Sequence, residues 1–403
     1  MPPHALPLPL TAALLMFMQV GFALVTTGLC RARNVGQIVT GNVMILVASL
    51  LGFWLAGALV FQTPIAAAPG QFLVASLAVS IAAVIPAGAM AERWGLRNIV
   101  WYGFWMGALP IPLLGRWIWM GGWLARHHFL DFAGSSVIHM AGGVTALVGA
   151  LLLGPRIGKY SRDGRPKPMP GHNLVFVCVG ALVLFVGWFG FNCANASASD
   201  HLELICVNTL LAGAAGAFAA YATTVVKFGK PDPSMICNGL LAGLVSISAA
   251  CAYFNSIAAV ITAVITGAIA GVLVIHSVLL FEGTFKVDDP VGAISVHGVG
   301  GLWGVLSLGL FASDPQVSGA FGKVFGGPAN DASQLGAQCL GALVCLLIIG
   351  ALAFVWFKIS NLITPLRARR DFEIGGLDLP ETGAECYPDF HLTEKSSSNI
   401  GMQ

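Results

Sequence analysis

The stretch SVIHMAGGVTALVGALLLG, residues 136–154, runs for 19 residues without a single Asp, Glu, Lys or Arg. Its one ionisable side chain, His139, is followed by small residues in the pattern His-x-x-Gly-Gly. A helix needs about 20 mainly apolar residues to cross the hydrocarbon core of a bilayer. The stretch therefore predicts a membrane-spanning helix that carries a histidine.

A second stretch, SVHGVGGLWGVLSLGLF (295–311), repeats the pattern with His297 ahead of Gly300 and Gly301. Counted from the N-terminus, the two stretches are the fifth and the tenth apolar segments. A five-span unit that occurs twice starts its second copy on the opposite side of the membrane. Such inverted repeats are common in transporters, where the substrate path lies between the two halves near the midplane. We therefore predict that His139 and His297 face each other across such a path.

Charged residues are scarce throughout the chain, with 20 Lys or Arg and 18 Asp or Glu among 403 residues, or 9%. A soluble domain is about one quarter charged. This composition, with 57% hydrophobic residues, excludes a soluble enzyme, a nucleic-acid binder and a disordered scaffold. The charge-free windows are 1–30, 34–91, 132–155, 168–199, 204–226, 233–281, 290–313 and 332–357.

Two of these windows are too long for one span, and each splits where helix breakers or polar residues gather, at 62–70 and at 252–256. The segment 98–124, interrupted only by Arg116, adds another span and brings the total to eleven. The runs are too long for barrel strands, so we predict an all-α polytopic membrane protein. We predict a membrane domain (1–365) followed by a cytoplasmic C-terminal tail (366–403). The membrane domain consists of repeat one (about 8–155), repeat two (about 171–312) and an eleventh helix (about 332–365).

The basic residues predict the orientation. With the N-terminus outside, only Arg116, Arg126 and Lys323 fall in outer segments, whereas the other seventeen Lys and Arg residues lie in cytoplasmic loops or the tail. Cytoplasmic loops of membrane proteins carry an excess of Lys and Arg. We therefore predict N-terminus out, C-terminus in, and a multi-pass protein of the cell (plasma or inner) membrane.

The two histidines allow more than one interpretation. A lone His on an apolar helix is usually a core residue with one satisfied hydrogen bond. Ionisable groups inside spans are costly, however, and usually face a bundle interior or a pathway. Imidazole can hold or pass a proton near neutral pH, so two His in matching repeats favour a proton or amine relay. A metal site is disfavoured because two His without nearby Cys or carboxylate are a poor ligand set.

Cysteine and glycine patterns point to packing. The nine Cys show no paired or metal-type spacing, and an odd total argues against a disulfide framework, so we interpret them as small core residues. The segments GLLAG (239–243) and GAIAG (267–271) place small residues four apart, which permits close helix packing.

Two features mark the outer mouth of the predicted path. Asp131, at the outer start of the fifth span, suits a helix cap, and it could also give an outer vestibule a negative potential. Trp117, Trp119 and Trp123 gather at the outer end of the fourth span. They fit an interfacial aromatic belt, although one of them could bind a small cation through its ring face.

A more specific signal lies in six segments: MQVGFALVTTGLCRARNV (18–35), GAMAER (88–93), DFAGSSVIHMAGGVTALVGALLLGPRIGKY (131–160), GHNLVFVCVGALVLFVGWFGFN (171–192), DDPVGAISVHGVGGLWGVLSLGLFA (288–312) and GGLDLPETGAECYPDF (375–390). Together they resemble the ammonium transporter family (Amt, Mep and Rh proteins) over nearly the whole chain. The resemblance implies eleven spans in two inverted halves and a homotrimer with one pore per subunit. It also raises a PII-type regulator as a possible partner of the cytoplasmic tail.

The resemblance also implies roles for single residues. His139 and His297 match the twin pore histidines, which hydrogen-bond to each other. Trp119 matches the outer Trp that binds ammonium by a cation–π contact, and Asp131 matches the acid that stabilises that vestibule.

The gate departs from the family pattern. Phe191 matches one gate phenylalanine and Trp188 a Trp beside the pore. Relatives commonly carry Phe at two positions that here hold Val74 and Ala78, the second being the other gate phenylalanine. Asn195 stands where the outer site usually has Ser. We therefore expect an outer site that keeps its Trp and loses an aromatic wall, above a half-missing gate.

These residues predict ammonium transport, with NH4+ recruited outside and NH3 and a proton passing the twin His. The alternative is an ammonium sensor coupled to a signalling output domain. The polar segment EKSSSNIGMQ (394–403) is either the start of a linker to such a domain or a frayed terminus. A channel for another neutral solute, such as urea or carbon dioxide, is less favoured because the paired His suit a proton-exchanging substrate. The sequence predicts no enzyme activity, cofactor, metal or nucleic-acid partner.

Overall fold

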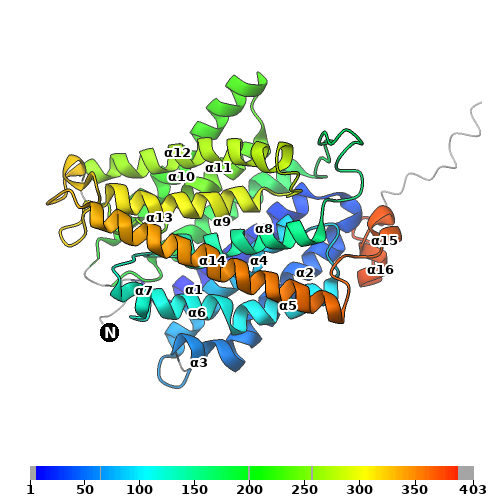
Figure 1. The fold of residues 1–403 in the computed structure, drawn as a ribbon, viewed down its shortest axis with the longest axis horizontal. Helices are drawn as coiled ribbons and strands as arrows, with labels where there is room; N and C mark the ends of the chain where they lie inside the picture. Colours follow the sequence, from blue (N-terminus) through cyan, green and yellow to red (C-terminus); the bar gives the residue numbers. More distant parts are fainter. Residues whose placement is uncertain (1–5, 64, 198–199, 256, 389–403) are drawn as a thin grey trace, which may run out of the picture.

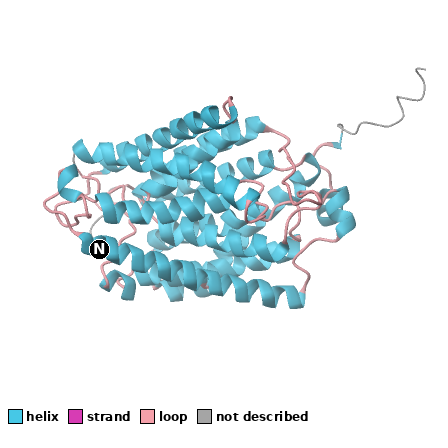
Figure 2. Ribbon diagram, turned by 45° about the horizontal axis from the view of Figure 1, so that its top comes forward, coloured by secondary structure: helices cyan, strands magenta, loops and turns pink. Residues whose placement is uncertain are grey.

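The computed structural model describes residues 6–63, 65–197, 200–255 and 257–388, and the described part is a bundle of helices without β-strands (Figures 1 and 2). The segment 394–403 lies outside the described residues. In chain order the helices are α1 (Leu8–Leu29), η1 (Ala32–Asn34), α2 (Val35–Gly52), η2 (Phe53–Gly57), α3 (Ala58–Phe61), α4 (Pro69–Ala89), α5 (Leu96–Ala108), α6 (Pro110–Ile118), α7 (Trp123–Arg126), η3 (Ser135–Met140), α8 (Ala141–Leu153), α9 (Leu174–Cys193), α10 (Leu202–Phe228), α11 (Pro233–Ile247), α12 (Ile257–Gly283), η4 (Ile294–Val299), α13 (Gly300–Phe311), η5 (Gly322–Phe325), α14 (Ala332–Ile363), α15 (Arg370–Gly375) and α16 (Asp378–Thr382).

Nine helical segments of the described chain are long and apolar enough to cross a membrane. This confirms a multi-pass, all-helical architecture. The two other predicted spans correspond to α11, which has 15 residues, and to α5 with α6, which are separated at Leu109. The count of eleven crossings therefore stays a prediction.

The breaks between helices follow the breakers in the sequence. Both long windows split as predicted, since α3 ends at Phe61 before α4, and α11 ends at Ile247 before α12. The single span predicted for 98–124 is divided into two helices, because α5 ends at Ala108 and α6 begins at Pro110. The ring of Pro110 cannot continue the preceding helix, and the residue lacks an N–H to donate.

The same pairs of neighbours recur along the chain. The first helices of the two predicted repeats, α1 and α9, pack against each other. Within the repeats, α2 packs on α5 as α10 packs on α12. The last helices, η3–α8 and η4–α13, also meet. The N-terminal end of α1 and the short helices α15 and α16 lie at opposite ends of the bundle (Figure 1).

Small residues let α10 and α12 approach closely. A Cβ atom added to Gly267 would lie 2.1 Å from the carbonyl oxygen of Ala212, and one added to Gly271 would lie 2.2 Å from that of Gly216. Real Cβ atoms are not found so close to a backbone oxygen, so α10 and α12 can pack in this way only with glycine there. The packing role predicted for GAIAG is therefore confirmed.

Large apolar side chains remain exposed on the outside of the bundle. Val226 on α10 is 87% exposed, and Leu362 and Ile363 on α14 are 86% and 80% exposed. A water-soluble monomer rarely shows extended apolar faces. These faces suit contact with lipid tails.

Candidate functional site

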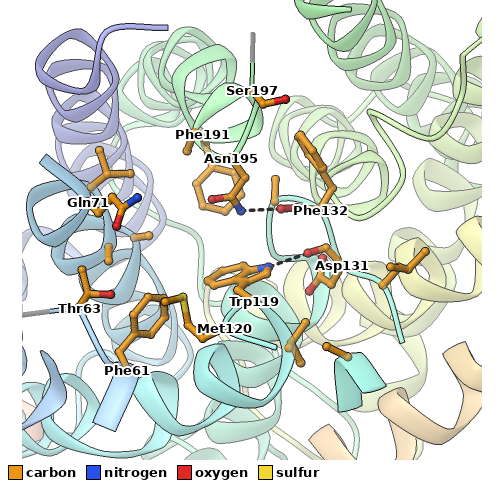
Figure 3. Close-up of a pocket in the computed structure, with 18 of the residues that line it drawn as sticks. Phe61, Thr63, Gln71, Trp119, Met120, Asp131, Phe132, Phe191, Asn195 and Ser197 are labelled. Carbon is orange, nitrogen blue, oxygen red and sulfur yellow. Dashed lines mark hydrogen bonds between the residues drawn. The ribbon is translucent and has the colours of Figure 1, made fainter. Parts of the chain in front are cut away.

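A cavity of about 420 Å3 lies where α1 begins, with Leu8 in its wall (Figure 3). Side chains from several elements line it, among them α4, α9, the end of α6 and the segment before η3. Six residues singled out from the sequence belong to this lining: Val74, Ala78, Trp119, Asp131, Phe191 and Asn195. The tertiary structure thus brings the predicted recruitment residues and gate positions to one cavity.

Trp119 is held in place by its indole nitrogen. The residue follows α6, and its Nε1–H donates to the backbone oxygen of Asp131 at 2.6 Å (Figure 3). The ring of Phe61 packs edge-on against it, with centroids 6.4 Å apart. Because the indole N–H is already bonded, the ring is fixed at the wall of the cavity. A fixed aromatic face is what a cation–π contact requires.

Asp131 is a buried helix cap, as the sequence predicts. Its Oδ1 accepts hydrogen bonds from the backbone N–H groups of Gly134 and Ser135, both at 2.9 Å. Its Oδ2 accepts from the N–H and hydroxyl of Ser136 and from the N–H of Val137, at 2.6–3.0 Å. Five donors fill the acceptor sites of a carboxylate. The acid therefore fixes the backbone beside the cavity and adds a negative charge there.

Aromatic rings line the cavity beside the aliphatic side chains of Val74 and Ala78. Phe61, Phe129, Phe132 and Tyr253 also supply rings, and none of these four residues was among the predicted site residues. Phe132 and Tyr253 meet edge to face at 6.1 Å. Phe132 directly follows Asp131, so its position in the chain was a signal that could have been used. No local pattern marks the other three.

Asn195 takes part in the wall through a backbone contact. The residue follows α9 and is exposed, and its Nδ2–H donates to the carbonyl oxygen of Phe132 at 2.6 Å (Figure 3). This bond joins the α9–α10 connection to the segment before η3. Asn195 thus helps to set the width of the cavity mouth.

Phe191 links the cavity to the histidines by contact. It lines the cavity, and its ring centroid lies 5.1 Å from that of His139. Trp188, one turn earlier on α9, stacks on His139 at 5.0 Å, and its Nε1–H donates to Ser248 Oγ at 3.0 Å. His139, His297 and Trp188 are outside the cavity lining. Of these three, His139 and Trp188 contact the ring of Phe191 directly.

The two histidines meet as the sequence predicts. The Nδ1 atoms of His139 and His297 are 3.2 Å apart, and their rings stack with centroids at 5.2 Å. Both side chains are buried, and Phe22 lies 5.7 Å from His297. A hydrogen bond between two Nδ1 atoms requires a proton on one and a free lone pair on the other. The pair therefore shares a single Nδ1 proton.

The glycines after each histidine allow this approach. A Cβ on Gly143 would lie 2.1 Å from the backbone nitrogen of Gly298, and one on Gly301 would lie 2.5 Å from the carbonyl oxygen of Ser135. These two are the second glycines of the His-x-x-Gly-Gly motifs. Each histidine also lies in a π-helical turn, η3 or η4, a conformation found frequently at functional sites. The motif thus serves the crossing of two helices at the His pair.

A second aspartate mirrors Asp131, in the segment VDDP (287–290), whose place just before the tenth apolar segment predicts a cap. Asp289 accepts hydrogen bonds from the N–H groups of Val291, Gly292 and Ile294 at 2.8–3.2 Å and so caps η4. Asp131 and Asp289 each precede their histidine by eight residues. This equal spacing was present in the sequence and would have identified the pair.

The neighbour of Asp289 belongs to a buried charge network. Arg156 binds Asp288 and Glu92, each at 2.9 Å, and Glu92 also pairs with Arg31. The side chains of Arg156, Asp288 and Glu92 are at most 2% exposed. Burial raises the pKa of the Asp288 carboxyl, but the Arg156 guanidinium outweighs burial and holds this pKa at about 2. Asp288 therefore stays charged at physiological pH.

The fold and site define a helical, multi-pass membrane protein with an aromatic cavity above a buried His pair. Residues 62–387 match the model of the Ammonium Transporter Family. Ammonium transporter Amt2 of Archaeoglobus fulgidus is 36% identical over 419 residues, covering 94% of this chain and 87% of that protein. Ammonium transporter Amt1 of Haloferax mediterranei is 33% identical, covering 94% and 78%. The chain belongs to the ammonium transporter family.

Solved structures show the same fold. A protein titled Sensor Amt Protein superposes with a TM-score of 0.85 at 30% identity, covering 93% of this chain and 97% of that chain. Mep2 of Candida albicans gives a TM-score of 0.77 at 23% identity, covering 90% and 86%. The likeness to Mep2 concerns the fold alone.

Proposed function

We propose that this protein carries ammonium across the membrane through the path formed by the cavity, Phe191 and the His pair. The proposal rests on one observation: Phe191 lines the aromatic cavity, and its ring also lies 5.1 Å from that of His139, which is hydrogen-bonded to His297. NH4+ binds in the cavity against the face of Trp119, near the charge of Asp131. It then loses its proton, and NH3 passes Phe191 and the histidines.

The apolar surroundings of the histidines give the path its selectivity. Moving an unpaired ion into an apolar environment costs many kcal/mol. Potassium cannot reduce this cost, whereas ammonium can release a proton and cross as a neutral molecule. The shared Nδ1 proton of His139 and His297 offers a separate route for that proton, because imidazole can accept and donate it near neutral pH.

The architecture that goes with this function is an inverted repeat in eleven crossings, with the N-terminus out and the C-terminus in. The recurring helix neighbours and the positive-inside distribution of Lys and Arg support it. We propose a homotrimer in the cell membrane with the cavity on the outer face. The tail then faces the cytoplasm, where a PII-type regulator or a fused output domain can contact it.

Current measurement on protein reconstituted in liposomes tests the proposal. An ammonium pulse should evoke a current or an internal pH change, and potassium at the same concentration should not. His139→Ala should abolish the response or remove the selectivity against potassium. Wild-type currents in this variant would reduce the His pair to a packing feature of the core.

An ammonium sensor is the second candidate. It is favoured by the similarity to the Sensor Amt Protein and by Val74 and Ala78 at the expected gate positions. A sensor should bind ammonium in the same cavity and yet give no ammonium current in the same liposomes. Urea flux without any ammonium response would instead indicate a channel for a neutral solute.

A further inference from the structure

Helix α9 carries a cysteine near each of its ends, and each lies against a cysteine of another helix. Cys193, the last residue of α9, has its Sγ 3.7 Å from the Sγ of Cys206 on α10. Cys178, in the second turn of α9, has its Sγ 3.8 Å from that of Cys237 on α11. All four are free thiols. The fold thus creates two dithiol pairs that the spacing in the sequence did not show.

The two pairs lie at opposite ends of the helix. Cys193 and Cys178 are 15 residues apart, which corresponds to about 22 Å along an α-helix. Cys193 directly precedes Ala194 and Asn195, which line the cavity. The pair Cys193–Cys206 is therefore at the cavity end, and the pair Cys178–Cys237 is at the end near the network of Arg156 and Asp288.

The geometry of the cavity-end pair suits closure. A disulfide bond joins sulfur atoms at about 2.05 Å, so the two Sγ atoms must approach by less than 2 Å. Side-chain rotation can supply much of such a movement without breaking either helix. Cys193 is buried, and Cys206 is half-buried. An external thiol reagent therefore reaches Cys206 first.

We propose that Cys193 and Cys206 are a redox-active pair that closes to a disulfide on the outer face, while Cys178 and Cys237 remain a dithiol on the cytoplasmic face. Disulfides persist outside the cytoplasm, and cytoplasmic thiols are kept reduced. This assignment of sides rests on the orientation given under the proposed function. Each pair has nearly the same sulfur separation, so the compartment decides between them.

The oxidant is a disulfide compound, such as oxidised glutathione or a thiol–disulfide oxidoreductase. The thiolate of Cys206 attacks one sulfur of that disulfide, which releases one thiol and leaves a mixed disulfide. The Cys193 thiolate then attacks the Cys206 sulfur and releases the second thiol. Two electrons and two protons pass in total from the cysteines to the two departing thiols.

The disulfide would join the end of α9 to the first turns of α10, close to Asn195 of the cavity lining. The hydrogen bond from Asn195 to the Phe132 backbone already joins the segment after α9 to the opposite wall. A disulfide at Cys193, two residues before Asn195, limits how far the end of α9 and the start of α10 can separate. The pair thereby links the redox state of the exterior to the stiffness of the cavity mouth.

Thiol trapping and peptide mass spectrometry test the proposal on the full chain in sealed vesicles with the cavity face outward. The vesicles are treated with oxidised glutathione, blocked with N-ethylmaleimide and digested. Both pairs follow the same exchange chemistry, so the side of the membrane that the oxidant reaches should decide which pair links. We therefore expect a linked Cys193–Cys206 peptide in at least about tenfold excess over any Cys178–Cys237 link. Thermal unfolding should shift upward on oxidation in the wild type and not in Cys193→Ser.

A second sample, oxidised in detergent, separates the possible failures. In detergent the oxidant reaches all faces of the protein. If N-ethylmaleimide still alkylates both Cys193 and Cys206 after oxidation in detergent, the proposed bridge is wrong. If the pair links in detergent, but Cys178–Cys237 is the pair that links in the sealed vesicles, the assigned orientation is wrong. Ammonium currents of Cys193→Ser in liposomes report on transport independently of either result.

Discussion

Asp131 and Asp289 cap the two helices that carry the histidine pair, but their surroundings differ. Asp131 borders a cavity of about 420 Å3 lined by Trp119 and several other aromatic rings. Asp289 follows Asp288, whose carboxylate is buried against Arg156. One end of the His-bearing helix pair is thus open and aromatic, and the other is filled with paired charges.

The difference shows how one local pattern can serve two tasks. A cap needs only a carboxylate placed to accept backbone N–H groups, and both aspartates meet that need. What lies around the cap decides the rest. Ring faces without a partner can take up a cation from water, whereas paired charges hold several loops together. We therefore expect mutations at the charged end to affect stability and mutations at the cavity end to affect binding.

The largest effect is expected for Arg156→Met. The variant removes the partner that two buried carboxylates, Asp288 and Glu92, share, and breaking a buried pair on one side costs about 3–5 kcal/mol. Thermal unfolding of the purified protein, followed by tryptophan fluorescence, should show a large drop in the midpoint. Arg165→Met is the matched control, because Arg165 and Asp163 form an exposed pair. Equal midpoints for the two variants would contradict a structural role of the network.

The next effect distinguishes the two caps. In Asp131→Asn the amide NH2 must face at least two donors, whichever oxygen it replaces. In Asp289→Asn the amide NH2 can take the Oδ2 position, which accepts one short hydrogen bond, from the N–H of Ile294 at 2.8 Å. An unsatisfied buried donor costs about 1–3 kcal/mol. The unfolding midpoint should therefore fall further for Asp131→Asn, and the opposite order would refute this account of the caps.

A smaller effect, on binding, is expected for Trp119→Leu. Loss of the ring face removes a cation–π contact of about 1–2 kcal/mol, which corresponds to about 5–30-fold weaker ammonium binding. The concentration dependence of the current, or calorimetry, measures it. Trp117→Leu is the control, because Trp117 packs on Trp123 and is not part of the cavity lining. The same loss in both variants would assign the effect to the membrane interface.

The smallest effect is expected for Ala78→Phe. Ala78 lines the cavity together with Phe191, so an added ring gives the cation a further face, worth about 0.5–1 kcal/mol. Ammonium affinity should rise about 2–5-fold. Ala78→Leu fills similar space without a π face and should leave the affinity lower than the Phe variant. Unchanged affinity in Ala78→Phe would remove this position from the binding site.

Much of the site followed from the sequence because its residues lie in short, specific patterns. The motif His-x-x-Gly-Gly identified both histidines, and they meet with their Nδ1 atoms 3.2 Å apart. Asp131 and Phe191 were found by their place in longer segments, and Trp119 by its position in the Trp cluster that precedes Asp131. Phe61 and Tyr253 were missed, since they come from segments far away in the chain and reach the cavity only through packing.

The sequence by itself determined the membrane class, the helical fold and the identity of the paired histidines. The physical reason is that a run of about 20 apolar residues has few stable structures in lipid, and an ionisable group within it is rare enough to stand out. The tertiary structure decided what surrounds those helices: the rings of the cavity, the charge network at Arg156 and the two cysteine pairs on α9. Such groupings depend on which helix faces meet, and short-range sequence patterns carry no record of those contacts.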